Sequence, residues 1–158
     1  MASTKTKTKI ARPSSSDEEV REFLAEIRLL EGSARILQSR IDVISAALSE
    51  TSTAIQTLEG TRGKPEGTEA LLPIGSGSFV KSKIVNPDTI LIGVGAGIIV
   101  EKSVEDSIKD LRIRSSDLER ARTNVTQQLG QILNQAEDYR AHLSELVRKK
   151  GGGSVEIV

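Results

Sequence analysis

Cysteine, tryptophan, net charge and long hydrophobic runs are all missing from this sequence of 158 residues. Without cysteine there is no disulfide and no thiolate metal site, which fits a reducing compartment. Lys plus Arg and Asp plus Glu number 22 each, so no overall field attracts nucleic acid or an acidic membrane. No apolar run reaches the roughly 18 residues of a membrane span, and the basic N-terminus lacks a signal peptide's apolar core. We therefore expect a soluble, cytoplasmic protein that binds neither nucleic acid nor membrane.

Aromatic residues are also scarce, at 2% of the chain, which is little for a compact core. Apolar residues recur instead in steps of three and four, and this spacing over more than five heptads is typical of a coiled coil. Eleven of the first twelve such positions are apolar. These positions are Val20, Phe23, Ile27, Leu30, Ala34, Leu37, Ile41, Ile44, Leu48, Thr51, Ile55 and Leu58.

A second seam of the same kind lies in the C-terminal third, where eleven of thirteen positions are apolar. Its positions are Val104, Ile108, Leu111, Ser115, Leu118, Arg122, Val125, Leu129, Ile132, Ala136, Tyr139, Leu143 and Leu146. The two seams predict an antiparallel helix pair in which Leu58 faces Ile108 and Val20 faces Leu146. Thr51 and Ser115 then share one layer and could hydrogen-bond to each other. We expect Arg122 to pack its stem and to extend its head group into solvent.

The middle segment is rich in Val and Ile and contains three turn signals. Four strands are predicted here: Glu69 to Ile74, Ser78 to Val85, Thr89 to Val94 and Gly97 to Lys102. They form two β-hairpins whose edges need strands from other subunits.

The overall prediction is an α+β chain, a long antiparallel two-helix coiled coil with two inserted β-hairpins. Its predicted parts are a disordered basic tail (1–16), an N-terminal helix (17–59), a linker (60–67), the two hairpins (68–103), a C-terminal helix (104–150) and a flexible tail (151–158).

The stretch LLPIGSGSFVKSKIV, residues 71–85, superficially matches a nucleotide-binding Gly-x-Gly-x-Phe loop. Val80 stands where the third loop glycine belongs, and no kinase catalytic motif follows. Glycine permits the positive φ of tight hairpin turns, which explains Gly75 and Gly77 without a phosphate. We therefore expect no enzyme activity and no cofactor. His142, the only histidine, has no companions for a metal site and is predicted to be a solvated surface residue.

The order and spacing of four motifs resemble the prefoldin family, alpha class, from about Val20 to Leu146. The motifs are Leu72-Pro73-Ile74-Gly75, Ser78-Phe79-Val80-Lys81, Val94-Gly95-Ala96-Gly97 and Val104-Glu105-Asp106. The resemblance implies a hexamer of two alpha-type and four beta-type subunits, with alpha–alpha self-association and the hairpins assembled into intersubunit β-barrels. It also implies an ATP-independent chaperone that captures non-native polypeptides between coiled-coil tips and delivers them to a group II chaperonin.

Two sets of residues are candidate sites. The last layers at the free end of the helix pair should be incompletely buried and should bind clients. This client-binding set is Val20, Phe23, Leu24, Ile27, Leu143, Leu146 and Val147. The oligomerisation set on the hairpins is Leu72, Ile74, Phe79, Val80, Ile84, Ile90, Ile92, Val94, Ile98 and Val100.

Three alternatives remain at this point. The tip residues could be ordinary seam residues. The protein could be a stand-alone, filament-forming relative of prefoldin, which shares the plan of hairpins within a coiled coil. A purely structural coiled-coil scaffold would use the same heptads but does not need four strands.

Overall fold

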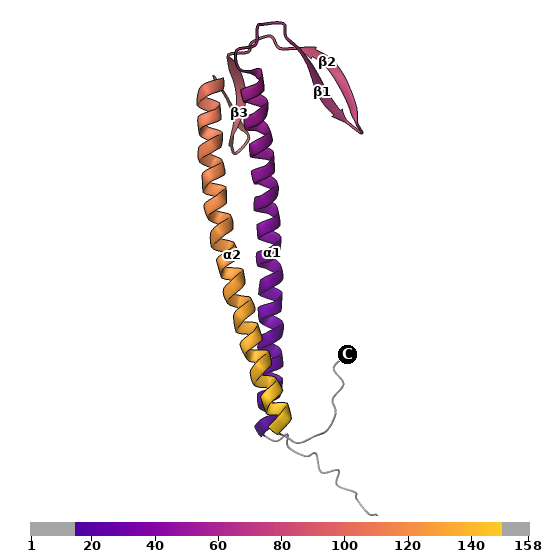
Figure 1. Ribbon diagram of the computed structural model, residues 1–158, viewed down its shortest axis with the longest axis vertical. Coiled ribbons are helices and arrows are strands. Elements are labelled where there is room, and N and C mark those ends of the chain that lie inside the picture. The colour runs from indigo at the N-terminus through magenta and orange to yellow at the C-terminus, as the bar shows by residue number, and fades with distance from the viewer. Residues whose placement is uncertain (1–14, 150–158) are drawn as a thin grey trace, which may run out of the picture. The chain divides into compact units, whose positions relative to one another are not determined.

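The computed structural model describes residues 15–149, and these form two long helices with two β-hairpins between them (Figure 1). The elements are α1 (Ser15–Thr61), β1 (Glu69–Gly75), β2 (Ser78–Lys83), β3 (Thr89–Gly95), β4 (Ile98–Ser103) and α2 (Val104–Lys149). The predicted fold of two helices and two hairpins is confirmed. Residues 1–14 of the predicted N-terminal tail, Lys150 of the predicted C-terminal helix and the whole predicted tail 151–158 lie outside the described residues.

The ends of the elements differ from the sequence prediction by one or two residues. Helix α1 already includes residues 15 and 16, for which the sequence predicts a disordered tail, and it continues to Thr61. Gly63 then adopts a φ of 72°, a left-handed conformation that ends a helix. Strand β2 stops at Lys83, two residues before the predicted end.

The described residues form two compact units. The first unit contains α1 up to Ser39 and α2 from Val125 onward, and the second contains Arg40–Asn124 with both hairpins. Within each unit the segments of α1 and α2 run antiparallel and lie side by side (Figure 1).

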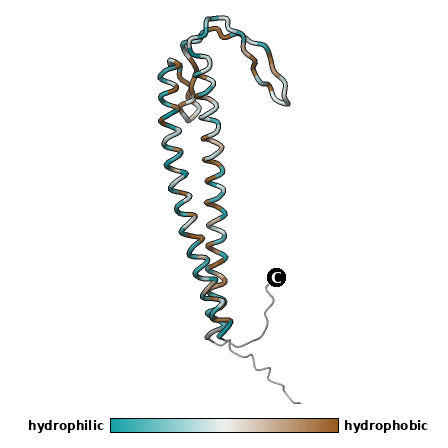
Figure 2. Tube along the Cα trace, viewed as in Figure 1, coloured by the Kyte–Doolittle hydropathy of each residue, from teal (hydrophilic) through white to brown (hydrophobic). Residues whose placement is uncertain are grey.

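The predicted seams are the buried faces of the helices. No seam position of α1 is exposed, and Arg122 is the only exposed seam position of α2. Arg122 is exposed, while the neighbouring Ala121 is half-buried. Figure 2 shows that hydrophobic residues recur at intervals along both helices.

One ion pair in each unit bridges the helices beside the seam. In the first unit Arg140 Nη2 lies 2.6 Å from Glu31 Oε1, and in the second Arg112 Nη2 lies 2.7 Å from Glu59 Oε1. Glu31 and Glu59 are four heptads apart, and so are Arg112 and Arg140. The seam therefore keeps one register, which agrees with the predicted one, although exposed pairs of this kind contribute at most about 1 kcal/mol each.

Thr51 does not behave as the sequence predicts. Its side chain is buried, and its hydroxyl donates to the backbone carbonyl of Ala47 at 2.8 Å rather than to Ser115. A threonine within a helix commonly satisfies its hydroxyl on its own preceding turn, because the i−4 carbonyl is always within reach. The prediction of a Thr51–Ser115 hydrogen bond is therefore wrong.

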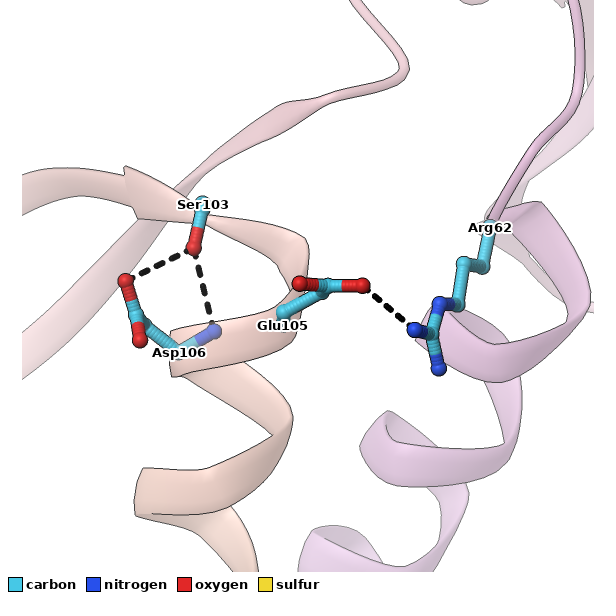
Figure 3. A network of polar contacts seen from close by, with 4 residues as sticks. All are labelled: Arg62, Ser103, Glu105 and Asp106. Atoms are coloured by element: carbon cyan, nitrogen blue, oxygen red, sulfur yellow. Dashed lines mark hydrogen bonds and ion pairs between the residues drawn. The ribbon is translucent and has the colours of Figure 1, made fainter.

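The start of α2 is stabilised by a cap and by an ion pair (Figure 3). Ser103 Oγ accepts a hydrogen bond from the Asp106 backbone N–H at 3.1 Å and donates one to Asp106 Oδ2 at 2.8 Å. This arrangement satisfies one of the free N–H groups of the first turn. The Arg62 guanidinium pairs with Glu105, which links the end of α1 to the start of α2. Lys102 Nζ lies 2.6 Å from Asp110 Oδ2, and this hydrogen bond, aided by the carboxylate charge, raises the pKa of Lys102.

Both hairpins close through two-residue turns in which both central residues have positive φ. These residues are Ser76 (50°) and Gly77 (72°) in the first hairpin, and Ala96 (49°) and Gly97 (75°) in the second. Two positive φ values are what a type I′ turn requires, and its twist matches that of the strands. The glycine-rich stretch that resembles a nucleotide-binding loop thus closes a hairpin.

Within residues 15–149, neither helix has an apolar stretch long enough to cross a membrane.

Replacing Ser107 with alanine should stabilise the protein. Ser107 has no solvent exposure, and its Oγ has no hydrogen-bond partner. Removing an unsatisfied buried hydroxyl relieves a cost of about 1–3 kcal/mol, which thermal unfolding followed by circular dichroism would register as a higher Tm. Ser52→Ala, at an exposed position of α1, is the control for the better helix propensity of alanine. A Tm gain no larger than that of the control would contradict the expectation.

Candidate functional site

The tip is the end of the first unit where α1 begins and α2 ends, and three rings gather there. The ring centroids of Phe23 and Tyr139 are 5.6 Å apart with an interplanar angle of 57°. The His142 ring stacks on Phe23 at 6.0 Å and 22°. An aromatic pair in such a tilted arrangement adds about 0.5–1.5 kcal/mol beyond the burial of its area. The aromatic cluster of these three residues therefore holds the two helix ends together.

Apolar side chains around the aromatic cluster remain partly open to solvent. Val20, Leu143 and Leu146 are half-buried, as is Phe23 itself. Leu24 and Val147 lie beside the seam and are 39% and 42% exposed. The tip consequently offers apolar surface from both helices.

Ile27 differs from the other predicted tip residues. It is only 7% exposed, so the expectation of incomplete burial is wrong for this side chain. Ile27 lies one turn further from the tip than Phe23. The seam layer of Ile27 has a neighbouring layer on each side, so its side chain is buried like that of an interior coiled-coil position. Counted from the interior of the unit toward the helix ends, the partly exposed tip surface therefore begins at the layer of Phe23.

Two residues of the tip were missed as site residues by the sequence pattern. Tyr139 is a seam position in the sequence, and His142 is predicted to be a solvated surface residue. His142 is exposed, but its ring also contacts Phe23. The heptad register of the sequence could have identified both residues, because they lie within one turn of Leu143, the predicted partner of Phe23. Among the described residues no group of three or more His, Cys, Asp or Glu is placed to hold a metal ion.

Charges of both signs surround the tip. Asp17 and Glu18 occupy the first turn of α1, and Arg148 and Lys149 occupy the last turn of α2. Each pair is favourable for the macrodipole of its own helix. The tip is therefore an apolar surface with a mixed-charge border.

The hairpins carry the other large apolar surface. Of the ten predicted oligomerisation residues, six are exposed and four are half-buried. The exposed ones are Leu72, Ile74, Phe79, Val80, Val94 and Ile98, and the half-buried ones are Ile84, Ile90, Ile92 and Val100. Four further exposed apolar residues were not predicted, namely Leu71, Val85, Leu91 and Ile99. The first hairpin is thus apolar on both faces, with Leu72 opposite Val80 and Pro73 opposite Phe79.

The second hairpin lies close to the helices of its unit. Strand β3 contributes Ile90, Leu91 and Ile92 to an open groove of about 760 Å³, whose other apolar walls are Ala54, Leu58 and Leu111. This location explains why Ile90 and Ile92 are half-buried. Each of the two described sheets has only two strands, so every strand has one edge without a strand beside it. Such edges readily accept strands from another chain.

Comparison with known proteins identifies the family. The family model described as "Prefoldin subunit" matches residues 30–149. Prefoldin subunit alpha of Archaeoglobus fulgidus is 29% identical over 136 residues, which cover 86% of this chain and 99% of that protein. Prefoldin subunit alpha 1 of Thermococcus kodakarensis is 37% identical over 93 residues, which cover 59% of this chain and 64% of that protein.

A solved structure agrees with the sequence matches. The cryo-electron-microscopy structure of the filamentous PFD of Methanocaldococcus jannaschii is 27% identical in sequence and has a TM-score of 0.58. The match covers 78% of this chain and 97% of the other. The chain therefore belongs to the prefoldin family, which is a family of non-enzymatic chaperones.

Proposed function

We propose that this chain is an ATP-independent chaperone subunit that captures non-native polypeptides at its tip and passes them to a group II chaperonin. The observation that carries the proposal is the apolar surface at the tip, where Leu24 and Val147 are exposed beside the aromatic cluster. The client-binding set is Val20, Phe23, Leu24, Leu143, Leu146 and Val147, now joined by Tyr139 and His142. Ile27 acts as the buried layer that supports them.

In the proposed mechanism each tip binds a client weakly, and several tips that bind the same client together hold it more tightly. A fully buried apolar side chain contributes about 1.5–3 kcal/mol, and the partial contacts available at one tip contribute less. One tip alone therefore binds weakly. Several tips that face one cavity raise the effective concentration and give avidity, and each contact still breaks fast enough for transfer to the chaperonin.

Assembly depends on the hairpins in this proposal. Prefoldin subunit alpha homologues imply an oligomeric assembly with other prefoldin subunits. We propose a hexamer of two alpha-type and four beta-type subunits, in which the exposed apolar residues of β1–β4 become the interior of intersubunit β-barrels. Alpha–alpha contacts form the centre of this platform. The absence of cysteine from the sequence is compatible with the reducing cytoplasm as its compartment.

A second candidate function is a stand-alone filament of this chain. It is favoured by one observation, which is the filamentous state in the name of the structural relative from Methanocaldococcus jannaschii. Open strand edges on both hairpins permit either a closed ring or an open chain of subunits.

Leu24→Ser combined with Val147→Ser should weaken client capture. Both side chains are exposed at the tip, so their loss removes apolar contact area without opening the seam. In an assay of client aggregation, the protection per particle should fall at least several-fold, because avidity multiplies the loss at each tip.

The matched control is Ile113→Ser combined with Leu133→Ser. These α2 residues are 54% and 48% exposed and lie away from the tip, so the control removes similar apolar area elsewhere. Equal protection by the tip variant and the unchanged protein, or equal loss in variant and control, would contradict the proposed site.

Phe79→Glu combined with Ile98→Glu should prevent assembly. Both residues lie on strands and are more than half exposed, and a charge there cannot enter a barrel interior. Light scattering after size-exclusion chromatography with a beta-type prefoldin subunit should show a hexamer for the unchanged chain and smaller species for the variant. Ile113→Glu combined with Leu133→Glu, which adds the same two charges at exposed apolar positions of α2, is the control. Long polymers from the unchanged chain alone would instead support the filament.

A further inference from the structure

A second apolar stripe follows α1 on the face opposite the seam. Its members keep the alternating steps of three and four, and none is charged. In the first unit they are Ala25, Leu29, Gly32, Ile36 and Ser39, and the same spacing continues along α1 with Val43 and Ala46. We call these seven residues the outer stripe.

The three large residues of the outer stripe are among the most exposed apolar side chains of the helices. Leu29, Ile36 and Val43 are 66%, 60% and 67% exposed. One isolated exposed leucine needs no explanation, but three at heptad spacing on one face are a pattern. The seam against α2 does not use them.

Helix α2 shows that this face need not be apolar in a coil of this kind. Seven consecutive positions on its outer face are charged or amide residues, and all are exposed; Ile113 and Ala141, the positions directly before and after them, are apolar. The seven are Asp117, Arg120, Asn124, Gln127, Gln131, Asn134 and Asp138. The two helices pack on each other through similar seams, so the seam alone does not account for the difference between their outer faces.

The alternation of sizes in the outer stripe matches an antiparallel copy of itself. Large residues (Leu29, Ile36, Val43) occupy one row, and small residues occupy the other. In an antiparallel helix pair the two rows face each other, so each large side chain meets a small one. A parallel pair would place large against large and glycine against glycine, with clashes and voids in alternate layers.

Gly32 supports a close approach of another helix. Glycine destabilises a helix interior, and a Cβ added at Gly32 would meet open space, so contacts within this chain do not require glycine. Ile36 of a second copy would fill the space that Gly32 leaves.

Charges beside the outer stripe change sign along α1. On one side Glu26 is followed two heptads later by Arg40, and on the other Arg28 is followed two heptads later by Asp42. An antiparallel copy brings the early part of one helix against the late part of the other. Opposite charges therefore meet toward both ends of the paired region, while Arg35, midway between Arg28 and Asp42, meets its own copy.

We propose that the outer stripe is a self-association surface, on which α1 of one chain pairs antiparallel with α1 of a second copy. The inference goes beyond the proposed function but draws one consequence from it. If hairpins gather in one platform, the α1 helices of one particle run in the same direction. The antiparallel pair then joins chains of two different particles.

The first test is a charge variant with a matched control. Leu29→Glu, Ile36→Glu and Val43→Glu together should abolish the concentration-dependent rise in weight-average mass above that of the hexamer formed with beta-type subunits, measured by sedimentation equilibrium up to about 1 mM, the range of the weakest specific contacts. Asn124→Glu, Gln127→Glu and Gln131→Glu add the same three charges to the outer face of α2 and should leave that rise unchanged. No rise in the unchanged protein, or equal loss in both variants, would overturn the proposal.

The second test determines orientation. Because the chain has no cysteine, introduced cysteines report one site at a time. A mixture of a Leu29→Cys chain with a Ser39→Cys chain should give a mixed disulfide under mild oxidation, because the register that sets Ile36 on Gly32 also sets Leu29 on Ser39. Leu29→Cys alone should give none, and a Leu29→Cys homodimer would overturn the antiparallel arrangement.

Gly32→Gln separates pairing from folding. It should raise the Tm of the helices, because glutamine is the better helix former, and yet reduce the mixed disulfide several-fold by blocking the close approach. A raised Tm with unchanged cross-linking would also overturn the proposal. Hairpin-driven assembly and client protection should persist in all outer-stripe variants, so a failure here is distinguishable from a failure of the proposed function.

Discussion

The narrow seam between α1 and α2 is the interaction on which the rest of the structure depends. A two-helix coil buries one stripe of each helix and has no third element to cover what remains. Only six apolar side chains, among them Ile27, Leu37 and Ile108, are buried within residues 17–149. With so little apolar burial, the chain relies on regular spacing over a long contact rather than on large aromatic side chains.

This limited burial also explains where the exposed apolar surfaces lie. The seam ends where the helices end, so the last side chains have neighbours on one side only. Phe23 is held by Tyr139 and His142, while Leu24 and Val147 stay open. In the middle of the sequence, each hairpin has two strands and cannot form a core of its own. Both sets of residues therefore leave apolar surface uncovered within the chain.

Polar groups within or beside the buried faces differ in whether they find a hydrogen-bond partner. Thr51 satisfies its hydroxyl on its own backbone, and Ser103 caps α2 together with Asp106. Ser107 is buried without a hydrogen-bond partner, although it lies only one turn into α2. Such a group lowers stability near the strand-to-helix junction, because its desolvation is not compensated.

Sequence periodicity by itself determined the two helices, their seams and the two hairpins, because steps of three and four and glycine turns are local signals. It also placed the tip residues, since the end of a seam can be counted. Only the tertiary structure decided that Ile27 is buried, that His142 lies on Phe23, and that Thr51 bonds to Ala47 rather than to Ser115. These outcomes depend on side-chain rotamers and on the spacing of the two helices, and a heptad pattern specifies which residues face each other but not how their side chains share that space.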